Sequence, residues 1–168
     1  MAEIPLTQGM VAIVDEEDFD YLNQWKWQAL RIGYAARSVI CQEKKRMIYM
    51  HQLLIDVPKG KETDHKDRNK LNNCRSNLRA CFHRQNTRNR GKPRKITSSI
   101  FKGVYWNKGR RKWQAYFRLP QPSGNGKVTN LGRFKDEEQA ALAYNEAATK
   151  YFGDFARLNT IQEGSYGR

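Results

Sequence analysis

An adjacent acid and histidine, Asp64 and His65, stand near the middle of the chain. Asn77 follows twelve residues after the histidine, and Asn86 follows nine residues after that. A neutral imidazole can take a proton from water, because its unperturbed pKa of about 6.5 leaves much of it basic near neutrality. Carboxylate and amide oxygens are the ligands that Mg²⁺ prefers. These residue types therefore indicate hydrolysis by an activated water beside a divalent cation.

Two short strands and a helix would position these side chains. We expect strands over residues 62–65 and 77–80, on either side of a polar loop, and a helix from His83 onward. This ββα arrangement brings the end of the first strand beside one face of the helix. Asp64 and Asn86 then offer two oxygens to one Mg²⁺ or Mn²⁺ ion, and His65 points at an adjacent water. A ligand set without thiolate or imidazole favours these ions over Zn²⁺.

Each of these residues has an ordinary structural interpretation when it is taken alone. An aspartate often shapes a turn at a strand end, a lone histidine more often packs or lies at the surface, and asparagines are common in loops and helices. Their joint spacing and order favour the catalytic interpretation. The three cysteines, Cys41, Cys74 and Cys81, form no Cys-x-x-Cys pair, so we expect reduced thiols and no zinc site.

The pattern DHxDxNxxNN…NLR…QN, with a lead-in at Met50–Leu54, resembles the HNH endonucleases, whose site is called the ββα-metal motif. The resemblance covers roughly residues 45–92. His65 falls on the first histidine of that family and Asn77 on its central asparagine. Asn86 falls on the last ligand position, which is a histidine in many members and an asparagine in a phage-type subgroup.

The resemblance implies a role for each matched residue. His65 is the general base, and Asp64 and Asn86 are the metal ligands. The side chain of Asn77 ties the loop after the first strand and so orients His65. The implied activity is hydrolysis of phosphodiester bonds in DNA.

The basic charge of the chain is concentrated in its second and third parts. The 168 residues include 31 Lys and Arg and 17 Asp and Glu, a net charge of +14. Residues 1–60 carry a net −1, residues 61–97 a net +9 and residues 98–168 a net +6. This clustering favours a polyanion over a diffuse solubilising surface, because basic groups that neutralise phosphates release counterions. DNA contacts within the middle segment are assigned to Arg84, Arg88 and Arg90.

A different pattern begins near residue 100. We expect strands over residues 101–107, 111–119 and 127–134, with a turn cluster at 121–126. A helix is expected to begin at Asp136, with Gln139 completing a capping box, and to end at Phe152-Gly153. Its buried stripe is predicted to contain Ala140, Ala143, Tyr144, Ala147 and Tyr151.

A second resemblance is carried by the motifs KGV at 102–104, KWQA at 112–115, LGRF at 131–134, AALAYNEAA at 140–148 and ARLN at 156–159. They resemble the Apetala-type (ethylene-response-factor) DNA-binding domain, whose three-stranded sheet enters the major groove. The resemblance implies an outward, base-reading face of Tyr105, Asn107, Tyr116, Arg118 and Asn130, with Lys102 and Lys108 on phosphates. Val128 and Asn130 stand where that family has an Arg and a Trp near the third strand. The resemblance therefore implies DNA binding but not the base preference of that family.

Together these patterns predict an α+β protein with a ββα-metal nuclease domain and a sheet of three antiparallel strands packed on one helix. The expected boundaries are 1–92 for a mixed N-terminal region with the nuclease domain (core about 61–92), 93–99 for a linker, 100–160 for the DNA-binding domain and 161–168 for a tail.

The predicted function is metal-dependent cleavage of double-stranded DNA, by nicking or double-strand cutting, in a homing or free-standing endonuclease of phage type. One alternative is a non-catalytic DNA-binding protein, and the presence of all four site residues argues against it. Another is a basic RNA-binding protein, since charge alone does not distinguish RNA from DNA. The sequence is compatible with a monomer or a homodimer.

A membrane location is not expected. The longest aliphatic stretch, Val11–Val14, is far shorter than the ~20 residues of a membrane span. The start Met1-Ala2-Glu3 has no basic region followed by an apolar one, so no secretory signal is expected. We therefore expect a cytoplasmic protein.

Overall fold

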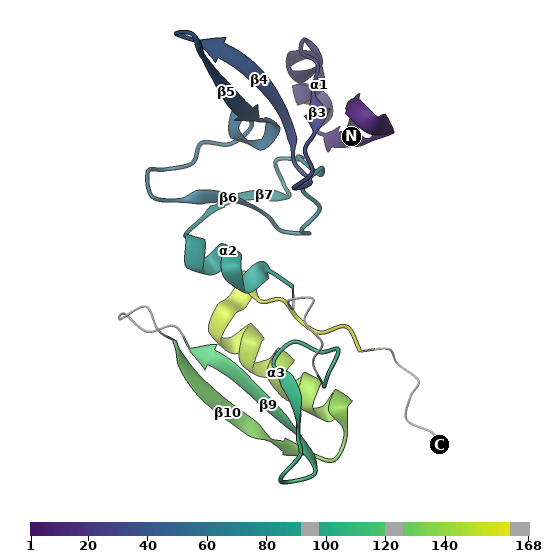
Figure 1. The fold of residues 1–168 in the computed structure, drawn as a ribbon, viewed down its shortest axis with the longest axis vertical. Helices are drawn as coiled ribbons and strands as arrows, with labels where there is room; N and C mark the ends of the chain where they lie inside the picture. Colours follow the sequence, from purple (N-terminus) through teal and green to yellow (C-terminus); the bar gives the residue numbers. More distant parts are fainter. Residues whose placement is uncertain (92–97, 120–125, 162–168) are drawn as a thin grey trace. The chain divides into compact units, whose positions relative to one another are not determined.

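Small antiparallel sheets and short helices make up the computed structural model, which describes residues 1–91, 98–119 and 126–161 (Figure 1). The chain divides into two compact units, Met1–Thr87 and Arg88–Arg168. This mixture of helix and strand agrees with the predicted α+β class. Within the described ranges, no helix is both long and apolar enough to cross a membrane.

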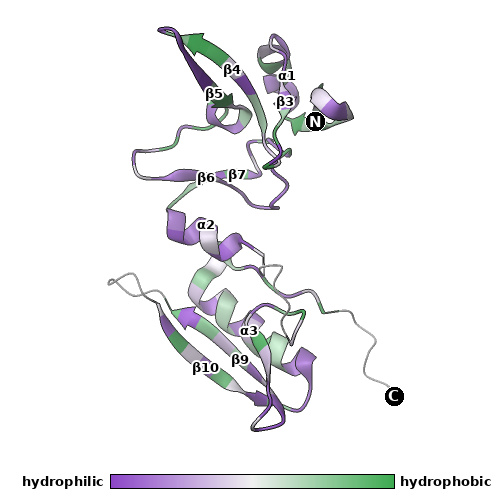
Figure 2. Ribbon diagram, in the orientation of Figure 1, coloured by the Kyte–Doolittle hydropathy of each residue, from purple (hydrophilic) through white to green (hydrophobic). Residues whose placement is uncertain are grey.

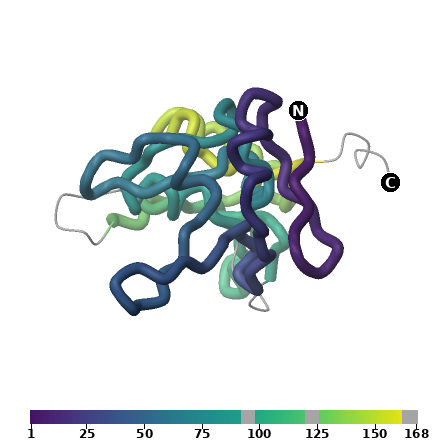
Figure 3. Tube along the Cα trace, turned by 90° about the horizontal axis from the view of Figure 1, so that it is seen from above, coloured from purple at the N-terminus to yellow at the C-terminus, as the bar shows by residue number. Residues whose placement is uncertain are grey.

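The first unit begins with strands that pair in sequence order. Its elements are β1 (Ala2–Pro5), the 3-10 helix η1 (Thr7–Gly9), β2 (Val11–Val14), α1 (Glu16–Asn23), β3 (Gln28–Ala29), β4 (Ala35–Cys41), β5 (Lys44–Tyr49) and the 3-10 helix η2 (Met50–Leu53). β1 pairs with β2, and β3, β4 and β5 form a second sheet. β4 and β5 form a hairpin that extends away from the rest of this unit (Figure 1, Figure 3). Its turn has only two residues, Gln42 and Glu43, both at positive φ, as a tight hairpin turn requires.

The core of the first unit lies between its small sheets and α1. Buried side chains from β1, β2, α1 and η2 meet there, among them Ile4, Val14, Leu22, Trp27, Met50 and Leu54. The Trp27 indole N–H donates to the backbone carbonyl of Leu22 over 2.8 Å, so this large side chain is buried with its polar atom satisfied. Leu78, from the strand β7 described next, joins the same core. The core therefore anchors β7 through Leu78.

The predicted nuclease motif follows as β6 (Glu62–His65), β7 (Leu78–Cys81) and α2 (His83–Asn89). β6 pairs antiparallel with β7, and the pairs include Asp64 with Arg79. The predicted first strand and the helix start are confirmed, and the second strand begins one residue later than expected. The last two residues of α2 belong to the second unit. Figure 2 shows α2 as mostly hydrophilic, in agreement with its sequence.

The second unit contains three strands and a helix where they were predicted, but the first strand begins at Val104 and not at residue 101, because residues 101–103 form a bend and a turn. β8 (Val104–Asn107), β9 (Lys112–Leu119) and β10 (Lys127–Phe134) form a sheet in the order β10-β9-β8, and α3 (Glu137–Phe152) packs on one face and ends in the 3-10 helix η3 (Gly153–Phe155). Small alanines let α3 lie close to the sheet. Gly103, at φ +75°, has space for no side chain, because a Cβ there would lie 2.1 Å from the ring of Tyr144.

Two details of the predicted helix are wrong. Asp136 is the N-cap of α3, but its side chain makes no capping hydrogen bond, so the expected capping box with Gln139 is absent. The buried face contains Ala141 and Ala148 in addition to Ala140, Tyr144 and Ala147, whereas Tyr151 is 47% exposed. Tyr151 instead stacks on Phe117 at the edge of the core, with ring centroids 5.0 Å apart. Ala143 is only partly buried.

Some predicted features lie outside the described residues. These are residues 93–97 of the expected linker, all but Gly126 of the turn cluster, and all of the tail except Ile161. The proposed boundaries of the two functional domains stay predictions.

Candidate active site

Asp64 and His65 occupy the last two positions of β6. Successive side chains of a strand point to opposite faces, so the acid and the histidine lie in different surroundings. Asp64 shares its face with Glu62, two residues earlier. Both Asp64 and His65 are buried. The strand thus separates a carboxylate side of the site from an imidazole side.

On the carboxylate side, Asp64 is paired with the arginine directly opposite in β7. Arg79 donates from Nε and Nη2 to Oδ2 of Asp64, over 2.9 and 2.7 Å. The side chains of Asp64 and Arg79 are only 5% and 13% exposed. A buried carboxylate needs such a partner to remain charged at low cost. The sequence alone did not identify Arg79, because only the register of β6 and β7 shows that it lies opposite Asp64.

Asn86 reaches this same side of the sheet from α2. Its Nδ2 donates to Oε1 of Glu62 over 2.7 Å. Nδ1 of His83, at the start of the helix, lies 3.3 Å from the other oxygen of Glu62. Glu62 therefore joins Asn86 to the strand face that carries Asp64, and the sequence alone did not single it out.

On the imidazole side, aromatic rings surround His65. The centroids of His51 and Tyr34 lie 5.4 and 5.9 Å from that of His65. Burial lowers the pKa of His65 below its ordinary value of 6.5, and burial also lowers the pKa of His51 to about 4. Both imidazoles are therefore neutral at neutral pH, as a proton acceptor must be.

Asn73 determines which nitrogen of His65 carries the proton. Nε2 of His65 lies 3.2 Å from Oδ1 of Asn73. An amide oxygen can only accept, so this bond requires a proton on Nε2 and places the basic lone pair on Nδ1. Asn73 is itself anchored, since its backbone N–H donates to the carbonyl of Ile13 in β2 over 2.7 Å.

Asn77 closes the loop between β6 and β7. Its Nδ2 donates to Oδ1 of Asp67 and to the carbonyl of Asn72, over 2.9 and 2.7 Å. Its Oδ1 accepts from the backbone N–H of Asp67 over 3.0 Å. These bonds tie the segment that follows His65 to the segment that precedes β7. They are the contacts expected of a residue that orients His65 through its loop.

The donors on the carboxylate side fit a hard cation. They are a carboxylate and a primary amide, with a second carboxylate next to them, and Mg²⁺ prefers oxygen ligands while keeping several waters. Within the described ranges, no three His, Cys, Asp or Glu side chains are grouped as metal ligands. A cation bound to Asp64 would share this carboxylate with Arg79.

The second unit carries its polar side chains on the sheet face opposite α3. Register pairs Tyr105 with Gln114, Asn130 with Tyr116, and Arg133 with Gln114. This outward face contains the predicted residues Tyr105, Asn107, Tyr116, Arg118 and Asn130, and it adds Lys112, Gln114 and Arg133. A hollow of about 510 Å³ is lined by Arg110, Lys112, Asn130, Gly132 and Arg133. Three cations around one hollow are suited to a phosphate backbone.

The remaining predicted DNA contacts differ in exposure. Arg84, Arg90 and Lys108 are exposed. The guanidinium of Arg88 lies 4.8 Å from the ring centroid of Phe152. Lys102 donates from Nζ to the carbonyls of Arg88 and Arg90, over 2.6 and 3.0 Å. Lys102 thus holds the backbone of its own unit, and its phosphate contact stays a prediction.

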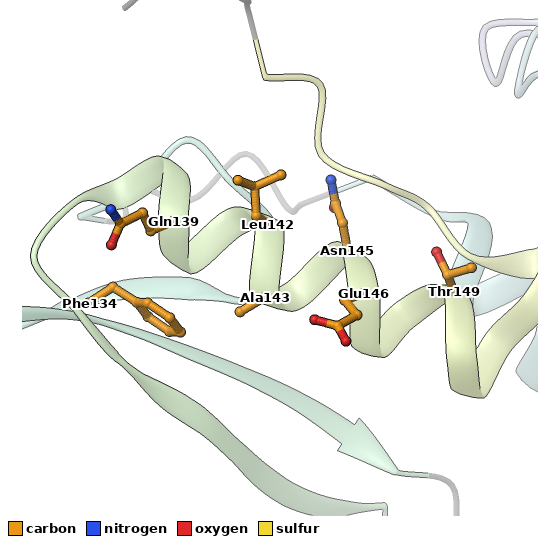
Figure 4. A pocket seen from close by; sticks show the side chains of 7 residues that line it. All are labelled: Phe134, Gln139, Leu142, Ala143, Asn145, Glu146 and Thr149. Atoms are coloured by element: carbon orange, nitrogen blue, oxygen red, sulfur yellow. The ribbon is translucent and has the colours of Figure 1, made fainter. Parts of the chain in front are cut away.

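A larger pocket lies elsewhere in the second unit. Figure 4 shows its lining along α3, with Phe134 on one side, and its volume is about 610 Å³. The side chains are Phe134, Gln139, Leu142, Ala143, Asn145, Glu146 and Thr149. A lone carboxylate among neutral groups offers no pair for acid–base work, so this pocket is not a candidate active site.

Comparisons with known proteins agree on the central motif. A family described as HNH endonuclease matches residues 56–88, a range that contains Asp64, His65, Asn77 and Asn86. A protein of Acanthamoeba polyphaga mimivirus, described as an uncharacterized HNH endonuclease, is 33% identical over 155 residues, which are 92% of this chain and 77% of the relative. Protein 3.8 of Escherichia phage T7 is 32% identical over 102 residues, 61% of this chain and 78% of the relative. No solved structure matches.

Proposed function

The chain belongs to the HNH endonuclease family, and from this premise we propose that it is a metal-dependent endonuclease that cleaves double-stranded DNA under the guidance of its C-terminal unit. As a nuclease it acts on nucleic acid, and its viral relatives fit a phage-type enzyme. The observation that carries the proposal is the division of β6, with the carboxylate of Asp64 on one face and the neutral imidazole of His65 on the other.

In the proposed mechanism, His65 removes a proton from the attacking water. The ring is neutral and already carries a proton on Nε2, so the proton from water goes to Nδ1. Asn73 holds this form of the ring, and Asn77 holds the loop that follows it. The base is thus fixed by its surroundings before substrate binds, which lowers the cost of reaching the reactive geometry.

Asp64 and Asn86 would hold the cation, Mg²⁺ or Mn²⁺. The cation supplies neutralisation of charge on the phosphate and on the leaving oxygen. The positive charge of Arg79 beside Asp64 adds to the field that an anionic phosphate meets. These residues would hold the ion and the charge of the phosphate, while His65, the next residue of β6, would take the proton from water.

Affinity for DNA is assigned mainly to the sheet of the second unit. Its outward face combines Arg118, Arg133 and Lys112 with Tyr105 and Asn130, and such a face offers both phosphate contacts and base contacts. The resemblance of this half to the Apetala-type domain supports the same assignment. The exposed Arg84 and Arg90 add phosphate contacts beside the nuclease motif.

The test is to incubate the purified chain with supercoiled plasmid in Mg²⁺ or in EDTA, and with a structured RNA in parallel. We expect nicked or linear plasmid with Mg²⁺, no cleavage in EDTA and intact RNA. Cleavage of the RNA in place of the plasmid would assign the site to an RNA nuclease. A single active site cuts one strand per event, so nicked plasmid is expected first.

A further inference from the structure

We propose that Glu62 is a positioning residue of the metal site: its carboxylate fixes the side-chain amide of Asn86 so that the amide oxygen faces the cation. This inference rests on the proposed metal site at Asp64 and Asn86. Glu62 itself is not a ligand in this account. It acts through Asn86.

The two ends of the Asn86 amide group differ in what they can bind. A primary amide has a nitrogen that only donates and an oxygen that only accepts, and the two can exchange places by rotation of the group. A cation binds the oxygen and is repelled by the nitrogen. An asparagine is therefore a reliable metal ligand only where something holds its nitrogen on the other side.

Glu62 supplies that restraint. Nδ2 of Asn86 donates to Oε1 of Glu62 over 2.7 Å, a short bond to a charged acceptor. With its nitrogen committed to Glu62, the amide presents Oδ1 in another direction. A rotated amide would place Oδ1 against the carboxylate, where two acceptors repel each other. Glu62 thus favours the orientation that a cation needs.

The position of Glu62 makes it the link between the two ligands. It lies two residues before Asp64 on β6, so both carboxylates emerge from the same face of the strand. It also pairs in register with Cys81, the last residue of β7 before α2. The Cys81 thiol lies 3.5 Å from the backbone carbonyl of Glu62. Backbone and side chain of Glu62 therefore fix β6 to the start of the helix that carries Asn86.

The test uses Mn²⁺ binding to the full chain, measured by electron paramagnetic resonance, together with the thermal unfolding temperature. Glu62→Ala removes the acceptor, and we expect it to weaken Mn²⁺ binding about 10- to 100-fold, the range found for partners that orient metal ligands. Glu62→Gln removes the charge but keeps an oxygen that accepts from Asn86, so its affinity should stay within about threefold of the natural chain.

Two further variants make the outcome unambiguous. Glu3→Ala removes an exposed carboxylate from β1 and should leave Mn²⁺ binding unchanged. Asp64→Ala should abolish it. Wild-type affinity in Glu62→Ala, or equal losses in Glu62→Ala and Glu62→Gln, would overturn the inference while leaving the metal site in place. Absence of Mn²⁺ binding by the natural chain, or binding that survives Asp64→Ala, would instead overturn the proposed site and this inference together.

Discussion

The two units differ in the exposure of their polar side chains. In the first, Asp64, His65, Asn73 and Asn77 are buried, and each is held by hydrogen bonds to its neighbours. In the second, the polar residues of the sheet, such as Arg118, Asn130 and Arg133, are exposed. Groups that must act on one atom gain from being fixed before substrate arrives. Groups that bind an extended polyanion gain from exposure, where they can meet many phosphates.

This contrast leads to a separation of effects. Substitutions among the fixed residues should change the rate of cleavage or the stability of the fold, and should alter DNA affinity little. Substitutions on the exposed sheet should change affinity and site preference, and should alter the chemical step little. The predictions below test this separation, beginning with the largest effect.

His65→Ala should lower the single-turnover cleavage rate about 10²- to 10⁴-fold, because the general base is lost. DNA affinity should stay within a few-fold, since the buried imidazole contributes no phosphate contact. The measurements are quenched-flow cleavage and a binding titration of the same duplex. In the natural chain, the rate should fall only at a pH below 6.5, because burial lowers the pKa of His65 and protonation removes the base. A His65→Ala enzyme that cut at the natural rate between pH 6 and 9 would end this assignment.

Arg79→Ala should lower the free energy of unfolding by about 3–5 kcal/mol, because it leaves the buried Asp64 without its partner. Urea denaturation of the full chain measures this change. Lys45→Ala, on the exposed β4–β5 hairpin, is the matched control and should change stability by about 0.5 kcal/mol or less. If the two variants were equally stable, the pairing of Arg79 with Asp64 would not support the fold.

A fragment of residues 98–168 should fold alone and bind duplex DNA without metal, because it has its own sheet, helix and core. If it neutralises about four phosphates, its affinity should fall about 100-fold between 50 and 200 mM salt. Fluorescence anisotropy at several salt concentrations gives the slope. Residues 1–96 should keep Mg²⁺-dependent cleavage with weaker affinity. A folded fragment that ignores DNA would show that the second unit serves another partner.

Arg118→Ala should reduce discrimination between duplex sequences more than Lys108→Ala does, because Arg118 lies on the outward face of β9 whereas Lys108 is assigned to phosphate. We expect a change of a few-fold, smaller than those above. Competition binding against a random-sequence duplex measures it. If both variants lost affinity equally for all duplex sequences, Arg118 would also be assigned to the phosphate backbone of DNA.

Much of the framework could be predicted from the sequence. The bounds of β6 and the start of α2 follow from a polar motif between turn residues, and β9 follows from the alternation of its apolar and polar residues. Asp64, His65, Asn77 and Asn86 are singled out as candidates by their spacing and by the resemblance to the HNH family. These features depend on neighbours along the chain, which a sequence displays directly.

What could not be predicted depends on contacts between distant residues. The pairing of Arg79 with Asp64 needs the strand register, and the contact of Asn73 with His65 needs a loop anchored on β2. The sequence predicted a phosphate contact for Lys102, and it could not show that the Lys102 amine donates to two backbone carbonyls. Glu62 had a usable signal, because its position two residues before Asp64 places it on the same strand face.

The central claim is that Asp64 and Asn86 hold the ion that drives cleavage, and the most direct test is the Mg²⁺ dependence of plasmid cleavage by the natural chain and by Asn86→Ala. The natural chain should require Mg²⁺ and be inactive in EDTA. Asn86→Ala should need a higher Mg²⁺ concentration and be partly rescued by Mn²⁺, which is less demanding of its ligands. Full activity in EDTA, a requirement for Zn²⁺ alone, or an unchanged Mg²⁺ requirement in Asn86→Ala would contradict the claim.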